Sequence, residues 1–308
     1  MPGKITKKDI EILSFISEYK FLTVKQLSSL TQRTTQVVRR RLRHLRDNHH
    51  IVMKERGFGA GRGQPENIII LTQKGMELLQ DWKILSDHAT YITDKTMESM
   101  FINHDLLVNW FFIHLLQIGR DNQQIRTQHL TTSSHNLWEG NTDVPFLQER
   151  LTKDDSSENT HTMIPDGVFT ISNKVSQKAL LFFIEVDMGT EAWVNKERGP
   201  GDVRQKIINY QSIFRTCQYK RYKKAFQSEF NGFRLLFVTN SFGRMKKMCD
   251  LVAGMPPSDF VWLTDQERMF SKGLAAEIWA RGGKYQKPSE SILGPKLRFD
   301  APFVNKIQ

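Results

Sequence analysis

The chain has 308 residues, of which 39% are hydrophobic, so it is long enough for two ordinary domain cores, and general disorder is disfavoured. Its formal net charge of +11, with basic residues crowded into the N-terminal quarter, favours nucleic acid as the partner. The cysteines, Cys217 and Cys249, lack the close spacing of zinc ligands, which fits a reducing cytoplasm. No run approaches about eighteen apolar residues, so we expect neither secretion nor a membrane partner.

Three short helices are predicted at the N-terminus, over 6–20, 23–31 and 34–48. Each begins at a threonine, and the second has the S/T-x-x-Q capping pattern in Thr23 and Gln26. Apolar residues recur at helical spacing in all three. The segment therefore predicts a small helical domain.

The third predicted helix has one apolar face, because Val38, Leu42 and Leu45 lie at i, i+4 and i+7. Arginine and glutamine side chains elsewhere on such a helix can reach phosphates and base edges from the major groove. The candidate DNA-binding residues are Arg33, Gln36, Arg39, Arg40, Arg43 and His44, together with Arg56 and Arg62 from the hairpin that follows.

Two strand-like segments, 51–56 and 67–71, flank a glycine-rich turn at 57–65, and Thr72 can cap a further helix. Three helices followed by a hairpin with a basic tip are typical of a winged helix-turn-helix. We therefore expect residues 1–80 to bind double-stranded DNA. The alternative is a solvated helix face beside an ordinary hairpin.

The rest of the chain is expected to form a helical linker at 81–100 and a second domain at 101–308. The second domain has a predicted order of helix, three strands, helix, strand, helix, strand, which is an α/β sandwich around a mixed sheet and makes the whole chain α+β. The apolar strand 179–187 should be central. The other predicted elements are helices at 101–118, 201–215, 243–253 and 265–278, strands at 124–130, 166–172, 233–239 and 259–264, and a loop or edge hairpin within 131–164.

Three acids stand at the ends of two paired strands: Asp166, Glu185 and Asp187. Mg²⁺ and Mn²⁺ prefer oxygen ligands, so Asp166 and Glu185 are candidate metal ligands. Such a metal polarises a phosphate and lowers the pKa of a bound water. This chemistry also needs a cation near the nucleophile, normally a lysine two residues after the second acid, which is position 187.

The alternative for these acids is structural. Asp166 and Asp187 would cap strand ends, and Glu185 would pair with Arg204, Lys206 or another cation in a partly buried network. Glu191 could be a further ligand, but an N-cap role suits it equally.

The element order, with Pro165-Asp166 followed by Glu185-Val186-Asp187, resembles the PD-(D/E)xK nuclease superfamily. Gln205 and Tyr210 are similar to residues that certain members carry on this helix. The match fails at Asp187, where the superfamily usually has lysine. In some members this lysine lies on the following helix, and the resemblance implies that Lys206 or Lys196 could supply the charge here.

The chain also resembles, over most of its length, the replication-relaxation family of bacterial plasmids and mobile elements. This resemblance implies a DNA-binding role in plasmid replication, mobilisation or relaxation of supercoiled DNA, with poorly defined catalysis. The motifs that carry it are Gly61-Arg62-Gly63-Gln64-Pro65, Leu71-Thr72-Gln73-Lys74-Gly75, His104-Asp105, Pro165-Asp166-Gly167 and the segment from Phe183 to Glu191.

Three functions follow from these patterns. The first is a DNA-binding protein of a mobile element whose nuclease-like domain lacks standard catalysis and contacts DNA, a second copy of the chain or other plasmid-processing proteins. The second is a Mg²⁺- or Mn²⁺-dependent endonuclease or nickase directed by the winged helix. The third is a transcriptional repressor, which leaves the larger domain without a task unless it dimerises or senses a ligand.

Overall fold

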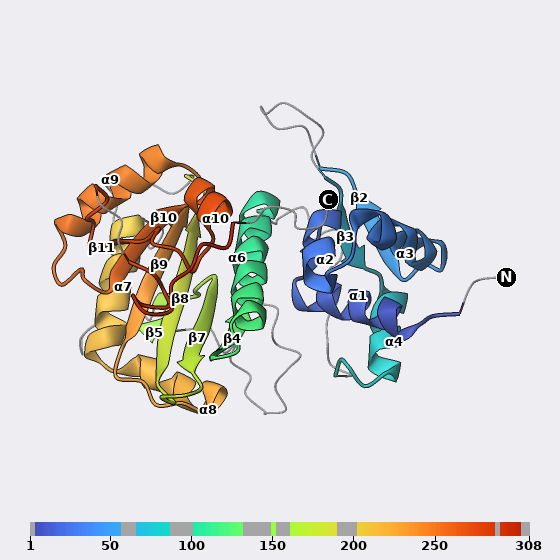
Figure 1. The fold of residues 1–308 in the computed structure, drawn as a ribbon, viewed down its shortest axis with the longest axis horizontal. Coiled ribbons are helices and arrows are strands. Elements are labelled where there is room, and N and C mark those ends of the chain that lie inside the picture. The colour runs from blue at the N-terminus through green and yellow to red at the C-terminus, as the bar shows by residue number, and fades with distance from the viewer. Residues whose placement is uncertain are drawn as a thin grey trace. The chain divides into compact units, whose positions relative to one another are not determined.

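The computed structural model describes residues 4–56, 66–86, 101–131, 149–151, 161–189, 202–286 and 290–302. The chain divides into two compact units (Figure 1), and the described residues up to Ile113 belong to the first. The wing turn at 57–65 and residues 87–100 of the expected linker lie outside the described residues.

The first unit combines helices with a small antiparallel sheet. The sheet order is β1-β3-β2, and both strand pairs are antiparallel. Helix, strand, two helices and a hairpin in this order make the winged helix-turn-helix fold that the sequence predicted. The elements are α1 (Lys7–Glu18), β1 (Phe21–Leu22), α2 (Val24–Thr31), α3 (Thr35–Asp47), β2 (Ile51–Lys54), β3 (Ile68–Leu71) and α4 (Gln73–Asp81).

Threonine side chains fix where the helices of this unit begin. The Gln26 amide donates to Thr23 Oγ1 at 3.3 Å, and the Thr23 amide donates to Gln26 Oε1 at 3.0 Å, which completes the predicted capping box. Thr34 and Thr72 cap α3 and α4 by accepting from amides three residues further on. The predicted starts of these helices are thus confirmed.

The strand β1 was not predicted. Its two residues, Phe21 and Leu22, are fully buried and pair with Ile70 and Ile69 of β3. Two residues are too few to show the alternation that marks a strand in a sequence. Burial against the hairpin, rather than local propensity, therefore defines this strand.

Helix α6 (Ile102–Asp121) begins in the first unit. Asn109 Nδ2 donates to the backbone oxygens of Tyr19 and Phe21 at 3.2 Å and 2.8 Å, and Gln26 Nε2 donates to the oxygen of Leu106 at 3.0 Å. These buried hydrogen bonds satisfy amide groups that would be costly to leave unpaired. The division between the units accordingly falls inside α6, whereas the sequence had placed all of this helix in the second domain.

The second unit is built on a six-stranded mixed sheet with the order β11-β10-β9-β8-β7-β4. Neighbours among β4, β7 and β8 are antiparallel, and neighbours among β8, β9 and β10 are parallel because helices connect them. The elements are β4 (Ile125–Thr131), β7 (Gly167–Asn173), β8 (Ala179–Asp187), α7 (Val203–Arg215), α8 (Tyr222–Phe226), β9 (Phe233–Thr239), α9 (Phe242–Ala253), β10 (Val261–Asp265), α10 (Gln266–Lys272) and β11 (Ala280–Arg281).

The core of this unit confirms that β8 is a central strand. Phe183 of β8, Leu235 of β9 and Leu263 of β10 are fully buried in one cluster with residues of α7 and α9, such as Ile207 and Met245. Figure 1 shows α7 and α9 beside the sheet. This packing fixes the ends of β7 and β8, where the acids lie. No helix in the described part is both long and apolar enough to span a membrane.

Three smaller features complete the described part of this unit. In the region where a loop or edge hairpin was expected, β5 (Glu149–Leu151) and β6 (His161–Met163) pair with each other as a separate two-stranded sheet. A short 3-10 helix, Gln218–Arg221, leads into α8. The last predicted helix is shorter than expected, because it stops at Gly273, whose φ of 87° is unfavourable for other residues.

Candidate functional site

The acids of the second unit meet at one end of the sheet. Gly167 pairs with Ile184 in the antiparallel β7–β8 register, which puts Asp166 opposite Glu185 at the next position. Asp166 Oδ2 accepts a hydrogen bond from the amide of Val186 at 2.7 Å. The predicted convergence of Asp166 and Glu185 is therefore present in the structure.

Glu185 is held by two side chains of α7. Tyr210 donates from its hydroxyl to Glu185 Oε1 at 2.6 Å, and Lys206 Nζ donates to Oε2 at 3.0 Å. Lys206 and Tyr210 are four residues apart, so they lie on the same face of the helix. Glu185 is 2% exposed, and the Lys206 side chain is 22% exposed. Lys206, a candidate from the sequence, thus contacts the buried acid from a partly exposed position on α7.

Burial raises the pKa of Glu185 to about 7. The ammonium of Lys206 opposes this shift, and the neighbouring charge of Asp166 adds to it. Burial and the neighbouring Glu185 carboxylate raise the pKa of Tyr210 well above its usual value, so the phenol stays a proton donor. A carboxyl group that titrates near neutrality can accept or hold a proton there.

Asp187 has a different set of contacts. Its Oδ2 accepts from Arg244 Nε of α9 at 2.7 Å, and its Oδ1 accepts from the amide of Gly189 at 2.7 Å. The Asp187 backbone oxygen also accepts from the amide of Asn240 at 3.1 Å. Asp187 therefore ties the end of β8 to α9 and shapes the turn after the strand.

Arg244 was not selected from the sequence. It is one of three basic residues on α9, with Lys246 and Lys247, and nothing in its local pattern shows that it turns toward the sheet. Of the other sequence candidates, Arg204 is exposed, and Lys196 and Glu191 lie outside the described residues. Gln205 donates from Nε2 to Asn209 Oδ1 at 2.9 Å, within its own helix.

In the first unit, α3 buries Val38, Leu42 and Leu45, which are at most 1% exposed. The opposite side of the helix is open to solvent and strongly basic. Its exposed residues include Gln36, Arg39, Arg40 and Arg43, all four of them predicted DNA contacts. Arginine and glutamine are side-chain types that can reach phosphates and base edges from a helix in the major groove.

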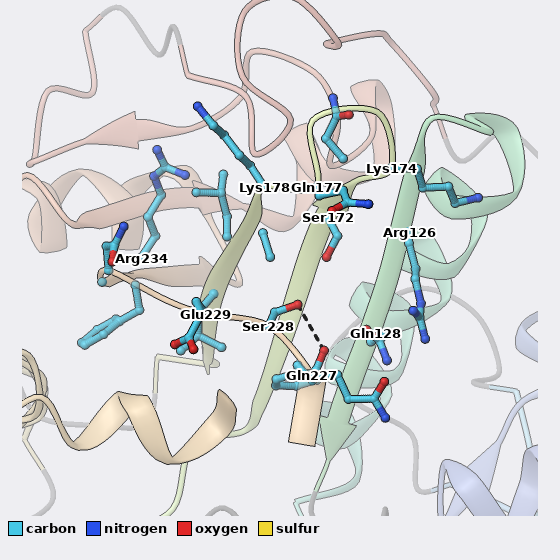
Figure 2. A pocket seen from close by; sticks show the side chains of 18 of the residues that line it. Arg126, Gln128, Ser172, Lys174, Gln177, Lys178, Gln227, Ser228, Glu229 and Arg234 are labelled. Atoms are coloured by element: carbon cyan, nitrogen blue, oxygen red, sulfur yellow. Dashed lines mark hydrogen bonds between the residues drawn. The ribbon is translucent and has the colours of Figure 1, made fainter. Parts of the chain in front are cut away.

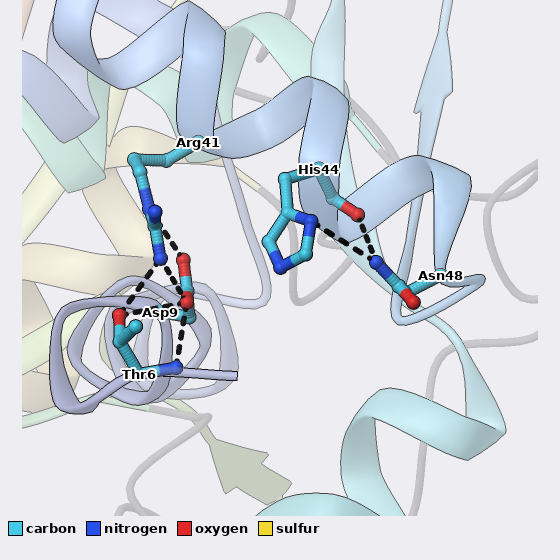
Figure 3. A network of polar contacts seen from close by, with 5 residues as sticks. All are labelled: Thr6, Asp9, Arg41, His44 and Asn48. Carbon is cyan, nitrogen blue, oxygen red and sulfur yellow. Dashed lines mark hydrogen bonds and ion pairs between the residues drawn. The ribbon is translucent and has the colours of Figure 1, made fainter. Parts of the chain in front are cut away.

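Several nearby basic side chains instead have partners within the protein. Arg33 is paired with Glu11 at 2.6 Å, and His44 Nδ1 lies 3.1 Å from Asn48 Nδ2. The side chain of Arg41, on α3, forms an ion pair with the fully buried Asp9 of α1 (Figure 3). Leaving that buried carboxylate unpaired would be strongly destabilising.

Two further predicted DNA contacts belong to the wing. Arg56, just after β2, is half-buried, and Arg62 lies outside the described residues. The sequence motif His104-Asp105 at the start of α6 forms an internal contact, with His104 Nδ1 3.1 Å from Asp105 Oδ1. Asp105 also lies 4.0 Å from Lys20 Nζ.

A family model described as Replication-relaxation matches residues 13–228, well over half of the chain. The chain belongs to the replication-relaxation family. A comparison with curated proteins gave no match.

Solved structures similar to this replication-relaxation protein include a MarR family transcriptional regulator from Silicibacter pomeroyi DSS, with 25% identity over 25% of this chain and a TM-score of 0.22. The chain spans 49% of that regulator. A mutant MepR from a multidrug resistant S. aureus clinical isolate is 19% identical over 35% of this chain and 80% of its own, with a TM-score of 0.24. Bacillus subtilis PadR in complex with operator DNA is 17% identical over 38% of this chain and 71% of its own, with a TM-score of 0.23.

The acid end of the sheet has donors that suit a hard divalent cation. Asp166 and Glu185 offer carboxylate oxygens, and Mg²⁺ is commonly bound by one or two carboxylates with water completing its shell. The pKa of Glu185 is raised in part by the charge of Asp166, and a cation would relieve that repulsion. Within the described residues, no group of three or more acids, histidines or cysteines is placed to hold a metal.

Proposed function

We propose that this replication-relaxation protein binds double-stranded DNA through α3 and acts in replication, mobilisation or DNA relaxation of a plasmid or other mobile element. The observation that carries this proposal is the exposed basic face of α3, made by Gln36, Arg39, Arg40 and Arg43. Gln36, Arg40 and Arg43 lie opposite the buried face of the helix and Arg39 flanks it, so none of them needs a rearrangement of the core to meet DNA.

The second unit, in this proposal, is a nuclease-like domain without standard catalysis. Asp187 stands where a catalytic lysine would be expected, and its carboxylate is bound to Arg244 and the Gly189 amide. A group engaged in this way supports the end of the strand and supplies no positive charge to a phosphate. The unit would then contact DNA, a second copy of the chain or another plasmid-processing protein.

Replacing both Arg40 and Arg43 with alanine tests duplex binding. A side chain that contacts a base contributes about 1–3 kcal/mol of discrimination, so we expect affinity for a cognate duplex to fall at least about tenfold. If both contacts are to phosphate, the slope of log affinity against log salt should become shallower by about 1.8. Fluorescence anisotropy with a labelled duplex at several salt concentrations measures both quantities.

The matched control replaces Lys7 and Lys8, two exposed lysines at the start of α1, with alanine. It removes the same formal charge away from α3. Equal loss of affinity in both variants would show that only net charge matters, and unchanged affinity after the arginine replacements would overturn the proposal.

A second candidate is a metal-dependent endonuclease or nickase, which is favoured by the 3.0 Å contact between Lys206 Nζ and Glu185 Oε2. In it, Asp166 and Glu185 would hold Mg²⁺ or Mn²⁺, which would activate water and polarise the phosphate. Lys206 would orient Glu185 and offer the positive charge that position 187 lacks. Tyr210 would keep Glu185 from rotating away.

Incubating supercoiled plasmid with the protein and Mg²⁺ or Mn²⁺ tests this candidate. We expect Glu185→Gln to abolish nicking and Lys206→Met to slow it by about 100-fold, since preorganised charge at a phosphate has that order of effect. Arg204→Met, at the exposed neighbouring position, should keep full activity. Nicking that survives Glu185→Gln and Asp166→Asn would come from another site or a contaminant.

A further inference from the structure

An open groove lies at the end of the second unit's sheet where β7 turns into β8 (Figure 2), with a volume of about 1060 Å³. It is lined by the β7–β8 turn, by β4, by the start of β9 and by the segment that follows α8. The acids lie at the other end of β7 and β8. With six residue steps from Gly167 to Asn173, the two ends are roughly 20 Å apart.

The groove is basic. Arg126 of β4, Lys174 and Lys178 of the β7–β8 turn, and Arg234 of β9 line it from different sides, as Figure 2 shows. Its acid, Glu229, forms an ion pair with Lys223, which offsets its charge. Clefts lined by one sign of charge concentrate ligands of the opposite sign.

The surface beside the groove continues this charge. From 203 to 234 the sequence has eight lysines and arginines against one acid. Besides Lys223, which pairs with Glu229, the exposed members next to the groove are Lys220, Arg221 and Lys224, around the short helix α8. A ligand with several negative charges spaced along it would meet cations both inside the groove and at its rim.

An exposed aromatic side chain also lines the groove. Phe214, at the end of α7, is 42% exposed although Tyr219 and Phe260 stack near it. Gly232 gives the ring its room, since a Cβ there would lie 3.0 Å from Phe214 Cε2. Exposed aromatic faces among cations are the platforms on which single-stranded bases stack.

Arg234 contributes a planar guanidinium, which can donate several hydrogen bonds, to the lining of the groove. Its Cζ lies 4.6 Å from the centroid of the Trp262 ring and 5.8 Å from that of Phe182. Within the described part of the chain, no carboxylate lies within ion-pair distance of this guanidinium. Ring contacts therefore hold it in place while its N–H groups remain suited to a phosphate.

We propose that this groove binds single-stranded nucleic acid, with backbone phosphates on Arg126, Lys174, Lys178 and Arg234 and a base on Phe214. Cations alone would suit any polyanion, but the exposed ring and the amide side chains of Gln128 and Gln177 suit bases as well. This site goes beyond duplex binding by α3, and neither site requires the other.

The test uses the full chain and a labelled single-stranded oligonucleotide of about 16 nucleotides, followed by fluorescence anisotropy. Lys174→Glu with Lys178→Glu should weaken binding by more than about tenfold and flatten the salt slope by about 1.4, for two lost phosphate contacts. The matched control, Lys247→Glu with Lys272→Glu, changes the same charge at exposed positions outside the groove and should bind at least about fivefold more tightly than the groove variant.

A second pair of variants tests the aromatic contact. Phe214→Leu removes the ring but keeps an apolar side chain, and we expect affinity to fall about tenfold, whereas Phe214→Tyr should bind as the unmodified chain does. Urea unfolding followed by circular dichroism reports whether the second unit of each variant remains folded. Arg40→Ala with Arg43→Ala should leave single-strand affinity within about twofold, so failure of either site is recognised separately.

Two outcomes would overturn the proposal. One is equal affinity for the oligonucleotide in the Lys174→Glu, Lys178→Glu variant and its charge-matched control. The other is competition by polyglutamate as effective as competition by unlabelled oligonucleotide, together with no loss in Phe214→Leu, which would identify an acidic polypeptide as the ligand.

Discussion

Glu185 is a buried carboxyl group whose charge state depends on a few neighbours. Removing a carboxylate from water favours its protonated form, and Lys206 only partly restores the charged form. The result is a pKa of about 7 for Glu185, against an ordinary value of 4.5. Near pH 7, therefore, both the protonated and the charged form of Glu185 are populated.

This shift predicts how stability varies with pH. Between about pH 4.5 and 7 the folded chain keeps the proton on Glu185 after the unfolded chain has released it. The free energy of unfolding should therefore fall as pH rises, by up to about 1.4 kcal/mol per pH unit in this window. The contribution of Glu185 is fully present below pH 4.5 and is lost as pH passes about 7.

Urea unfolding at several pH values, with a chelator present, measures the effect as a difference from Glu185→Gln, which cannot titrate there. Lys206→Met removes the ammonium that lowers the pKa of Glu185, so it should extend the loss of stability to higher pH. Parallel pH curves for the unmodified chain and Glu185→Gln would contradict the raised pKa.

Single residues also show how far a sequence can predict a site. Asp166 and Glu185 were predicted because both stand at the ends of neighbouring strands, and Lys206 was one of two lysines, with Lys196, that the resemblance to PD-(D/E)xK nucleases suggested. Arg41 and Arg244 were not given their partners, because Asp9 and Asp187 are distant in sequence and only the folded chain brings them close. Long-range ion pairs leave no periodic signal in the sequence.

At the scale of elements, helices and strands that carry their own pattern were predicted well. The buried face of α3, the central strand β8 and the strand β9 each follow from the spacing or density of apolar residues. The start of α6 was assigned to the second domain because its hydrophobicity covers most of the helix. That pattern indicates burial, but it does not say which core buries it.

The short elements could not be predicted for a related reason. Strand β1 has two residues, and β11 also has two, so neither shows a period. Each exists because a neighbouring strand offers hydrogen-bonding groups, β3 for β1 and β10 for β11. Pairing partners, which are set by the whole fold, decide such elements.

For the whole molecule, the exposed basic face of α3, where we propose that DNA binds, and the acids belong to different compact units. The hydrogen bonds described for Glu185 end on Lys206 and Tyr210, residues of its own unit. Substitutions at sites that share no partner usually have additive effects, within about 0.3–0.5 kcal/mol. Substitutions at Glu185 and on α3 should therefore change the free energy of duplex binding independently of each other.

A double-mutant cycle measures this independence. Duplex affinity is determined for the unmodified chain, for Glu185→Gln, for Arg40→Ala with Arg43→Ala, and for the variant that combines all three. We expect a coupling free energy below about 0.5 kcal/mol, because Glu185 and the two arginines share no contact. A coupling above about 1 kcal/mol would mean that one duplex is held by both units at once, so that the acid end of the sheet is itself part of the duplex-binding surface.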